Sequence, residues 1–132
     1  MEMMTILFVC VHNSGRSQMA EAFLNKLAIG RVITLSAGTE PAETLDPVVV
    51  EVMREAEIDI SHHQPKKLTP EMVEQADKVI TMGCGVEEVC PAAFVETEDW
   101  GLDDPKGKPL EKVREIREQI RARVLELLEE IP

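Results

Sequence analysis

A cysteine and an arginine with five residues between them form the segment of this sequence best suited to chemistry. The segment reads Cys10-Val11-His12-Asn13-Ser14-Gly15-Arg16-Ser17. A short loop that curls around an anion can direct several backbone N–H groups inward, and Asn13 and Gly15 are residue types that adopt the positive φ angles of such a curl. Arg16 adds a planar guanidinium that can bind two oxygens. Residues 11–17 are therefore predicted to bind a tetrahedral oxyanion.

The same loop is expected to activate the Cys10 sulfur. A thiolate is the reactive form of cysteine, and electropositive surroundings stabilise it. Ser17 can donate a hydrogen bond to the sulfur, and a helix that starts near Ser17 would add its positive N-terminal end. We therefore predict that Cys10 is a nucleophile. The alternative is a buried cysteine at a strand end with Arg16 on the surface, but the strand–loop–helix setting favours the functional interpretation.

Four predicted strands and four predicted helices must position this loop. Apolar runs indicate strands at residues 6–9, 32–35, 78–82 and 93–95. Apolar residues three or four positions apart indicate helices at residues 17–28, 47–56, 70–76 and 110–131. Asp46 and Thr69 each precede a proline and are predicted N-caps. The alternation of strand and helix predicts an α/β fold: one domain over residues 1–132, with a four-stranded parallel sheet and helices on both faces.

This topology predicts where the reactive segments meet. Parallel sheets bind ligands beyond the carboxyl ends of their strands. The first predicted strand ends at Cys10 and the third at Gly83-Cys84. We therefore expect both segments at the same edge of the sheet.

Composition excludes several classes of function. The formal net charge of −11 would repel a phosphate backbone, so we expect no nucleic-acid partner. No apolar run approaches the roughly 20 residues of a membrane span, and the N-terminal residues lack the basic region of a signal peptide. We expect a cytoplasmic protein without a membrane partner. We also expect a monomer, because no feature is typical of an obligate dimer.

The residues around the loop resemble those of a known family. Residues 9–21 read VCVHNSGRSQMAE, which is similar to the signature of low-molecular-weight tyrosine phosphatases and of the arsenate reductases that share their fold. The segments Ser36-Ala37-Gly38 and Asp103-Asp104-Pro105 fall where that family has matching segments, and the resemblance covers nearly the whole chain. The pair Cys84 and Cys90, together with the absence of tyrosine, points to the arsenate reductase branch.

The resemblance implies a mechanism and a role in arsenical resistance. Cys10 attacks arsenate and Asp104, with Asp103 as the second choice, protonates the departing hydroxide. Cys84 then attacks Cys10 and releases arsenite, and Cys90 attacks Cys84 to leave a Cys84–Cys90 disulfide. An external thiol such as thioredoxin reduces this disulfide, and no bound cofactor takes part.

The spacing of Cys84 and Cys90 constrains this relay. On one continuous helix, six positions correspond to roughly 9 Å along the axis, whereas a disulfide needs Cα atoms within about 7 Å. A bonded pair therefore requires a loop or an unwound helix. The thioredoxin-coupled members have six residues between these cysteines, and this chain has five. The reductant therefore remains open among thioredoxin, a glutaredoxin-like protein and a low-molecular-weight thiol.

A cation site is a further implication of the resemblance. Asn13, Glu21 and Ser36 match positions where some arsenate reductases bind potassium. The fourth ligand there is an aspartate, and the corresponding residue here is Lys66. We expect the lysine ammonium to replace the cation, so we predict no metal.

Three alternatives stay open from the sequence. The first is a phosphotyrosine or phosphomonoester phosphatase that acts through a phospho-cysteine on Cys10. The second is a redox-sensing or anion-binding module without turnover. The third concerns only Cys84 and Cys90, which could be buried residues or, less favoured without a CxxC pair, metal ligands.

Overall fold

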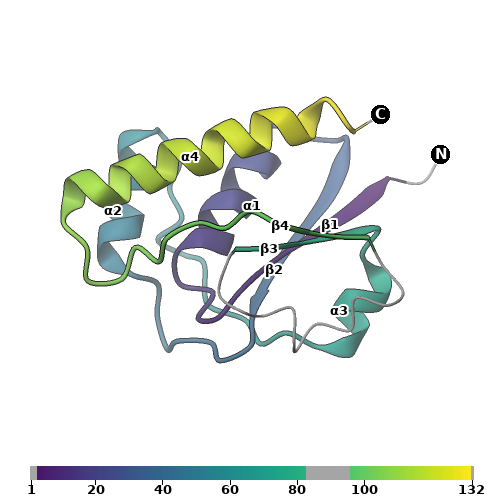
Figure 1. Ribbon diagram of the computed structural model, residues 1–132, viewed down its shortest axis with the longest axis horizontal. Helices are drawn as coiled ribbons and strands as arrows, with labels where there is room; N and C mark the ends of the chain where they lie inside the picture. The colour runs from purple at the N-terminus through teal and green to yellow at the C-terminus, as the bar shows by residue number, and fades with distance from the viewer. Residues whose placement is uncertain (1–2, 83–95, 132) are drawn as a thin grey trace.

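The computed structural model describes residues 3–82 and 96–131 (Figure 1). Eight elements follow one another along the chain. They are β1 (Met4–Cys10), α1 (Arg16–Leu27), β2 (Val32–Gly38), α2 (Pro47–Glu55), α3 (Pro70–Gln75), β3 (Lys78–Thr81), β4 (Glu96–Asp99) and α4 (Leu110–Leu128). None of the helices in this part of the chain combines the length and the apolar character needed to cross a membrane.

The four strands form one parallel sheet in the order β2-β1-β3-β4. Val9 of β1 is paired with Ala37 of β2 on one side and with Thr81 of β3 on the other. The carboxyl ends of the three strands therefore lie together, and Cys10 lies in the middle of that edge. The predicted α/β class and the predicted parallel sheet are confirmed.

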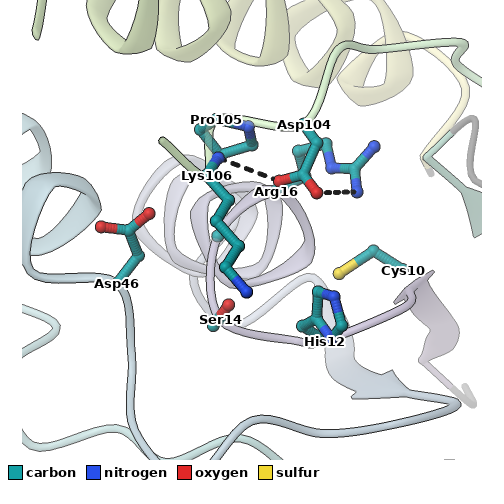
Figure 2. A pocket seen from close by; sticks show the side chains of 9 residues that line it. Cys10, His12, Ser14, Arg16, Asp46, Asp104, Pro105 and Lys106 are labelled. Carbon is teal, nitrogen blue, oxygen red and sulfur yellow. Dashed lines mark hydrogen bonds and ion pairs between the residues drawn. The ribbon is translucent and has the colours of Figure 1, made fainter. Parts of the chain in front are cut away.

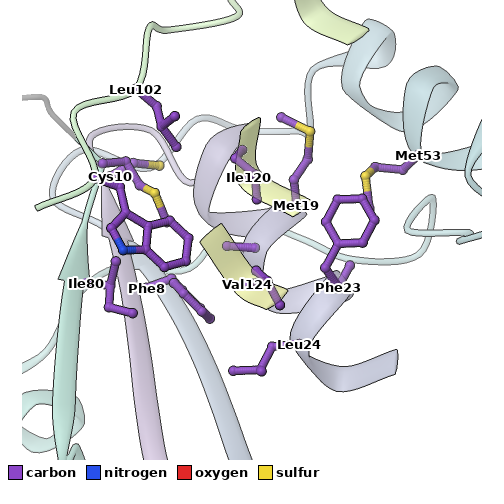
Figure 3. Packing of buried hydrophobic residues seen from close by; sticks show 14 of the residues in the cluster. Phe8, Cys10, Met19, Phe23, Leu24, Met53, Ile80, Leu102, Ile120 and Val124 are labelled. Atoms are coloured by element: carbon purple, nitrogen blue, oxygen red, sulfur yellow. The ribbon is translucent and has the colours of Figure 1, made fainter. Parts of the chain in front are cut away.

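Helices cover both faces of the sheet (Figure 1). α1, α2 and α4 pack on one face around Phe8, Phe23 and Ile120, and α3 packs on the other face against Leu7 and Val79. Figure 3 shows the larger cluster, in which the rings of Phe8 and Trp100 lie 5.6 Å apart. Successive residues of β1 point to opposite faces, and because both faces are covered its residues 6–9 are all apolar.

Two side chains fix the starts of α2 and α3 as the sequence predicts. The Asp46 carboxylate accepts a hydrogen bond from the Val48 amide at 2.9 Å. The Thr69 hydroxyl accepts one from the Met72 amide at 3.3 Å. Each cap is followed by a proline at the first helical position, where the missing N–H costs nothing.

The fourth strand was predicted at residues 93–95, which lie outside the described residues. Within the described part of the chain, β4 spans Glu96–Asp99. Among the described strands, β4 lies at the edge of the sheet and pairs with β3. An edge strand need not be apolar on both faces, so the acidic sequence ETED forms it without the pattern by which a buried strand is recognised.

Candidate active site

The loop between β1 and α1 surrounds the Cys10 sulfur with hydrogen-bond donors. Cys10 is the last residue of β1 and its side chain is buried. The Asn13 backbone amide donates to Sγ at 3.2 Å, and the Ser17 Oγ lies 2.9 Å from Sγ. Asn13 Nδ2 donates to the same hydroxyl at 2.6 Å, so Ser17 has its own proton free to donate to sulfur. Donation from Ser17 was predicted, and the geometry agrees with it.

Asn13 is the residue that holds the curl of the loop. Its φ of 50° is positive, as predicted for an asparagine in this place. Its side-chain oxygen accepts hydrogen bonds from Gln18 Nε2 at 3.0 Å and from the Lys66 amide at 2.8 Å. The side chain is fully buried, so the amide that faces sulfur is fixed before any ligand arrives.

Gly15 serves a different purpose from the one predicted. Its φ is −142°, so the expected positive φ is wrong. The reason for glycine is space, because a Cβ at this position would lie 2.9 Å from Cγ of Pro105. Gly38 at the end of β2 has a similar role, since a Cβ there would lie 2.6 Å from the Val11 carbonyl oxygen. Both glycines let neighbouring segments approach the loop closely.

Arg16 is buried and firmly anchored. Its Nη1 donates to the Met82 carbonyl at 2.9 Å and to the Leu102 carbonyl at 3.0 Å. Nη2 lies 3.8 Å from the Asp104 carboxylate, and no hydrogen bond joins Nε or Nη2 to residues 3–82 or 96–131. The alternative that Arg16 is a surface residue is therefore wrong. A guanidinium fixed on one edge can present its other edge to two oxygens of an oxyanion without first losing side-chain freedom.

A small hollow opens beside the cysteine and the arginine (Figure 2). It is lined by Cys10, His12, Ser14, Gly15, Arg16, Asp46, Asp104, Pro105 and Lys106. His12 belongs to the lining, and its Nδ1 lies 3.1 Å from the Glu40 carbonyl oxygen. Val11, by contrast, packs against the smaller core on the α3 face, so only its backbone remains for an anion. No phenylalanine, tyrosine or tryptophan is among the described residues that line the hollow.

Asp104, and not Asp103, lies at the hollow. The Asp104 carboxylate accepts a hydrogen bond from the Lys106 amide at 3.0 Å and faces Arg16. The Asp103 carboxylate instead pairs with Lys112 at 3.1 Å. The preference for Asp104 as the acid therefore agrees with the geometry, although its role stays a prediction.

Two lining residues escaped the sequence analysis. Asp46 was recognised only as an N-cap, and Lys106 was not singled out. Both come from loops far from residues 10–17 in the sequence, so no spacing links them to the cysteine. The position of Lys106 directly after Asp104-Pro105 is the one feature of the sequence that could have indicated its place in the pocket.

Comparison with known proteins decides the family. The family model described as low molecular weight phosphotyrosine protein phosphatase matches residues 5–132. The chain belongs to this family. A Halobacterium salinarum protein provisionally named an arsenate reductase is 44% identical over 128 residues, which cover 93% of this chain and 89% of that protein.

Solved structures of the family include reductases and a phosphatase. An arsenate reductase in the phosphate binding state is 37% identical, with a TM-score of 0.89 over 98% of this chain and 100% of that one. A Corynebacterium glutamicum thioredoxin-dependent arsenate reductase is 41% identical, with a TM-score of 0.84 over 97% of this chain and 61% of that one. A Geobacillus stearothermophilus arginine phosphatase is 29% identical, with a TM-score of 0.87 over 96% of this chain and 92% of that one.

The position at which family members were expected to bind potassium holds a lysine side chain. The Lys66 ammonium lies 3.4 Å from Ser36 Oγ and 3.7 Å from a Glu21 carboxylate oxygen. Glu21 also accepts a hydrogen bond from the Ser36 hydroxyl at 2.9 Å. The ammonium thus has the contacts expected of a cation substitute, and the absence of a metal stays a prediction.

Cys84 and Cys90 lie outside the described residues. They follow β3, whose last residue Thr81 is paired with Val9 next to Cys10. Met82, the last described residue before them, accepts the hydrogen bond from Arg16. The predicted meeting of the two segments at one sheet edge therefore holds as far as Met82.

Proposed function

We propose that this protein is an arsenate reductase in which Cys10 is the nucleophile and Cys84 and Cys90 carry the electrons. The observation that carries the proposal is a buried, hydrogen-bonded Cys10 sulfur beside the anchored Arg16, in a chain that matches named arsenate reductases over nearly all of its length. The two further cysteines provide what a reductase needs and a phosphatase does not.

In the first step, the Cys10 thiolate attacks the arsenic atom and an arsenic–sulfur bond forms. One oxygen leaves as water after Asp104 supplies a proton. The Nε and Nη2 edge of Arg16 and the backbone N–H groups of residues 11–17 hold the remaining oxygens. Hydrogen bonds from Asn13 and Ser17 stabilise the thiolate before the attack.

The second step is the reduction. The Cys84 thiolate attacks Cys10 Sγ, a disulfide forms, and the electron pair of the arsenic–sulfur bond passes to arsenic. Arsenic(V) thereby becomes arsenic(III) and leaves as arsenite. Cys90 then attacks Cys84, which frees the Cys10 thiolate and leaves a Cys84–Cys90 disulfide.

The oxidised pair requires an external dithiol, and no bound cofactor is needed. We propose a thioredoxin-like protein, because the similar enzyme from Corynebacterium glutamicum is thioredoxin-dependent. Two electrons from the dithiol close each cycle and balance the reduction of one arsenate.

Arsenite production with thioredoxin, thioredoxin reductase and excess NADPH tests the proposal. We expect repeated turnover by the wild type, and at most one turnover by Cys84→Ser and by Cys90→Ser. Hydrolysis of p-nitrophenyl phosphate is the matched control, since of the three cysteines it needs only Cys10, and it should survive in both variants. If both variants keep reducing arsenate through many cycles, the relay is wrong.

A phosphatase is the second candidate. It is supported by the shared loop and by the similarity to an arginine phosphatase. Cys10 would then form a phospho-cysteine that water hydrolyses, and Cys84 and Cys90 would be dispensable. Rapid phosphoester hydrolysis by wild type and both variants, with no arsenite from any thiol donor, would establish this alternative.

A further inference from the structure

We infer that Lys106 captures the oxyanion and selects for small, highly charged anions at the mouth of the pocket. The inference takes its substrate from the proposed function, because arsenate is such an anion. It extends that proposal, in which Arg16 is the cation that holds the substrate.

The backbone around Lys106 is fixed where its side chain can reach the pocket. The Lys106 amide donates to the Asp104 carboxylate at 3.0 Å, and the Lys108 amide donates to the Pro105 carbonyl at 3.1 Å. These bonds close a turn directly over the loop, and Pro105 packs where Gly15 leaves room. Figure 2 shows the Lys106 side chain extending from this turn toward Ser14, away from the Arg16 guanidinium.

The charges that line the pocket require a second cation. Arg16 contributes one positive charge, whereas Asp46 and Asp104 contribute two carboxylates. With Cys10 as the thiolate and Asp104 holding its proton, as proposed above, Cys10, Asp46 and Arg16 sum to one negative charge, and Lys106 brings the sum to zero. The whole chain carries −11, so its long-range field also repels an anion. Lys106 therefore removes a repulsion that Arg16 alone does not offset.

The ammonium is available for this task. Lys66, Lys78 and Lys112 are engaged with carboxylates at 3.0–3.7 Å. Lys106 forms no ion pair with any residue between 3 and 82 or between 96 and 131, although it lines the pocket. It also lines the adjoining hollow at Ala42 and Leu45, so the residue borders both hollows.

A cation at the position of Lys106 predicts that the pocket prefers free oxyanions to their esters. A free oxyanion exposes its full charge to both Arg16 and Lys106, whereas an ester presents less charge and adds an organic group. Among the described residues His12 supplies a ring in this lining, but no phenylalanine, tyrosine or tryptophan lies there, so an aryl ester finds no hydrophobic ring to pack on. Lys106 thus favours inorganic oxyanions over aryl phosphates.

The test is a titration of the full chain with inorganic phosphate. The dissociation constant is measured from the NMR shifts of the backbone amide signals of residues 11–17. Replacing an exposed charge near a bound ion should weaken binding by about 5-fold in Lys106→Gln at low ionic strength, and the difference should shrink in high salt. Lys106→Arg should restore the affinity. Lys108→Gln, two positions away and outside the pocket lining, is the matched control and should bind like the wild type.

Kinetics separate this inference from the proposed function. With arsenate, Lys106→Gln should raise KM about 5-fold and affect kcat much less, and Lys106→Tyr should shift the ratio of kcat/KM values toward p-nitrophenyl phosphate. The phosphate titration needs no turnover, so it stands even if no arsenite is formed. Equal phosphate affinity in wild type and Lys106→Gln at low salt would overturn the inference and leave the reductase proposal intact.

Discussion

The pocket has two regions of opposite character. The inner wall, formed by Cys10 and Arg16 with Asn13 and Ser17 in support, is buried, and each of these side chains is hydrogen-bonded. The rim, formed by Asp46, Asp104 and Lys106, is partly or fully exposed, and 47% of the Asp104 side chain is accessible. Groups that must act with fixed geometry are thus placed in the protein interior, whereas groups that exchange protons or attract ions remain in contact with water.

This difference predicts that inner-wall variants lose stability and activity together, whereas rim variants lose activity alone. The following expectations run from the largest effect to the smallest.

Arg16→Lys should have the largest effect. Lysine cannot bind the Met82 and Leu102 carbonyls with one edge and an oxyanion with the other, because it lacks the planar fork. We expect kcat/KM for arsenate to fall by about 10²–10³-fold and the free energy of unfolding to fall by about 1–3 kcal/mol. Steady-state kinetics and urea denaturation measure the two effects.

The control for this variant is Arg121→Lys, which changes an arginine on α4 far from the pocket lining. Loss of activity in Arg16→Lys with an unchanged free energy of unfolding would contradict the idea that the inner wall serves both purposes.

Asp104→Asn should remove the proton donor and leave the fold intact. General acids typically contribute 10²–10⁴-fold, and for this exposed group we expect a loss of about 10²-fold in kcat for arsenate reduction. The unfolding midpoint should stay close to that of the wild type. Asp103→Asn is the neighbouring control, and an equal loss in that variant would transfer the role to Asp103.

His63 should give the smallest effect, on stability alone. Burial lowers the pKa of His63 below its ordinary value of 6.5, and its ring lies 3.3 Å from the Gln18 side-chain oxygen behind the loop. A lowered pKa means that the unfolded chain binds the proton more readily. Stability is therefore full above the unfolded pKa and is lost as the pH falls through the folded pKa.

Thermal unfolding between pH 8 and pH 5 measures this effect. We expect a contribution below about 1 kcal/mol, because water reaches much of the ring. His63→Gln should flatten the profile over this range, and His62→Gln should keep most of it. Identical profiles for wild type and His63→Gln would remove His63 as a source of the pH dependence.

The sequence predicted those parts of the molecule that depend on local pattern or on burial. β1 was found because both of its faces are covered, and the caps at Asp46 and Thr69 were found because they act within three residues. The acidic residues of β4 were not predicted as a strand, because an edge strand need not be buried or apolar on both faces. The loop after Cys10 was predicted between a strand and a helix and lies between β1 and α1, because the three follow one another directly. Its binding of an oxyanion stays a prediction.

The rest of the pocket depends on contacts between distant segments. Gly15 is explained by Pro105, which lies 90 positions along the chain, and no spacing rule connects them. Lys106 and Asp46 reach the pocket only because two loops fold over it. The family resemblance identified Asp104, but a charge balance among four side chains can be judged only from their positions in space.

The two hydrogen bonds that Arg16 donates to backbone carbonyls have a consequence for the stability of the protein. The same guanidinium joins the end of β3 to the segment before α4 and offers its free edge to the anion. Binding of an anion in the pocket and folding of the chain are therefore thermodynamically linked. By mass action, an oxyanion present at a hundred times its dissociation constant adds about 2.7 kcal/mol to the free energy of unfolding. The substrate is thus also a folding ligand, and the lifetime of the native state rises with the concentration of the ion on which the protein is proposed to act.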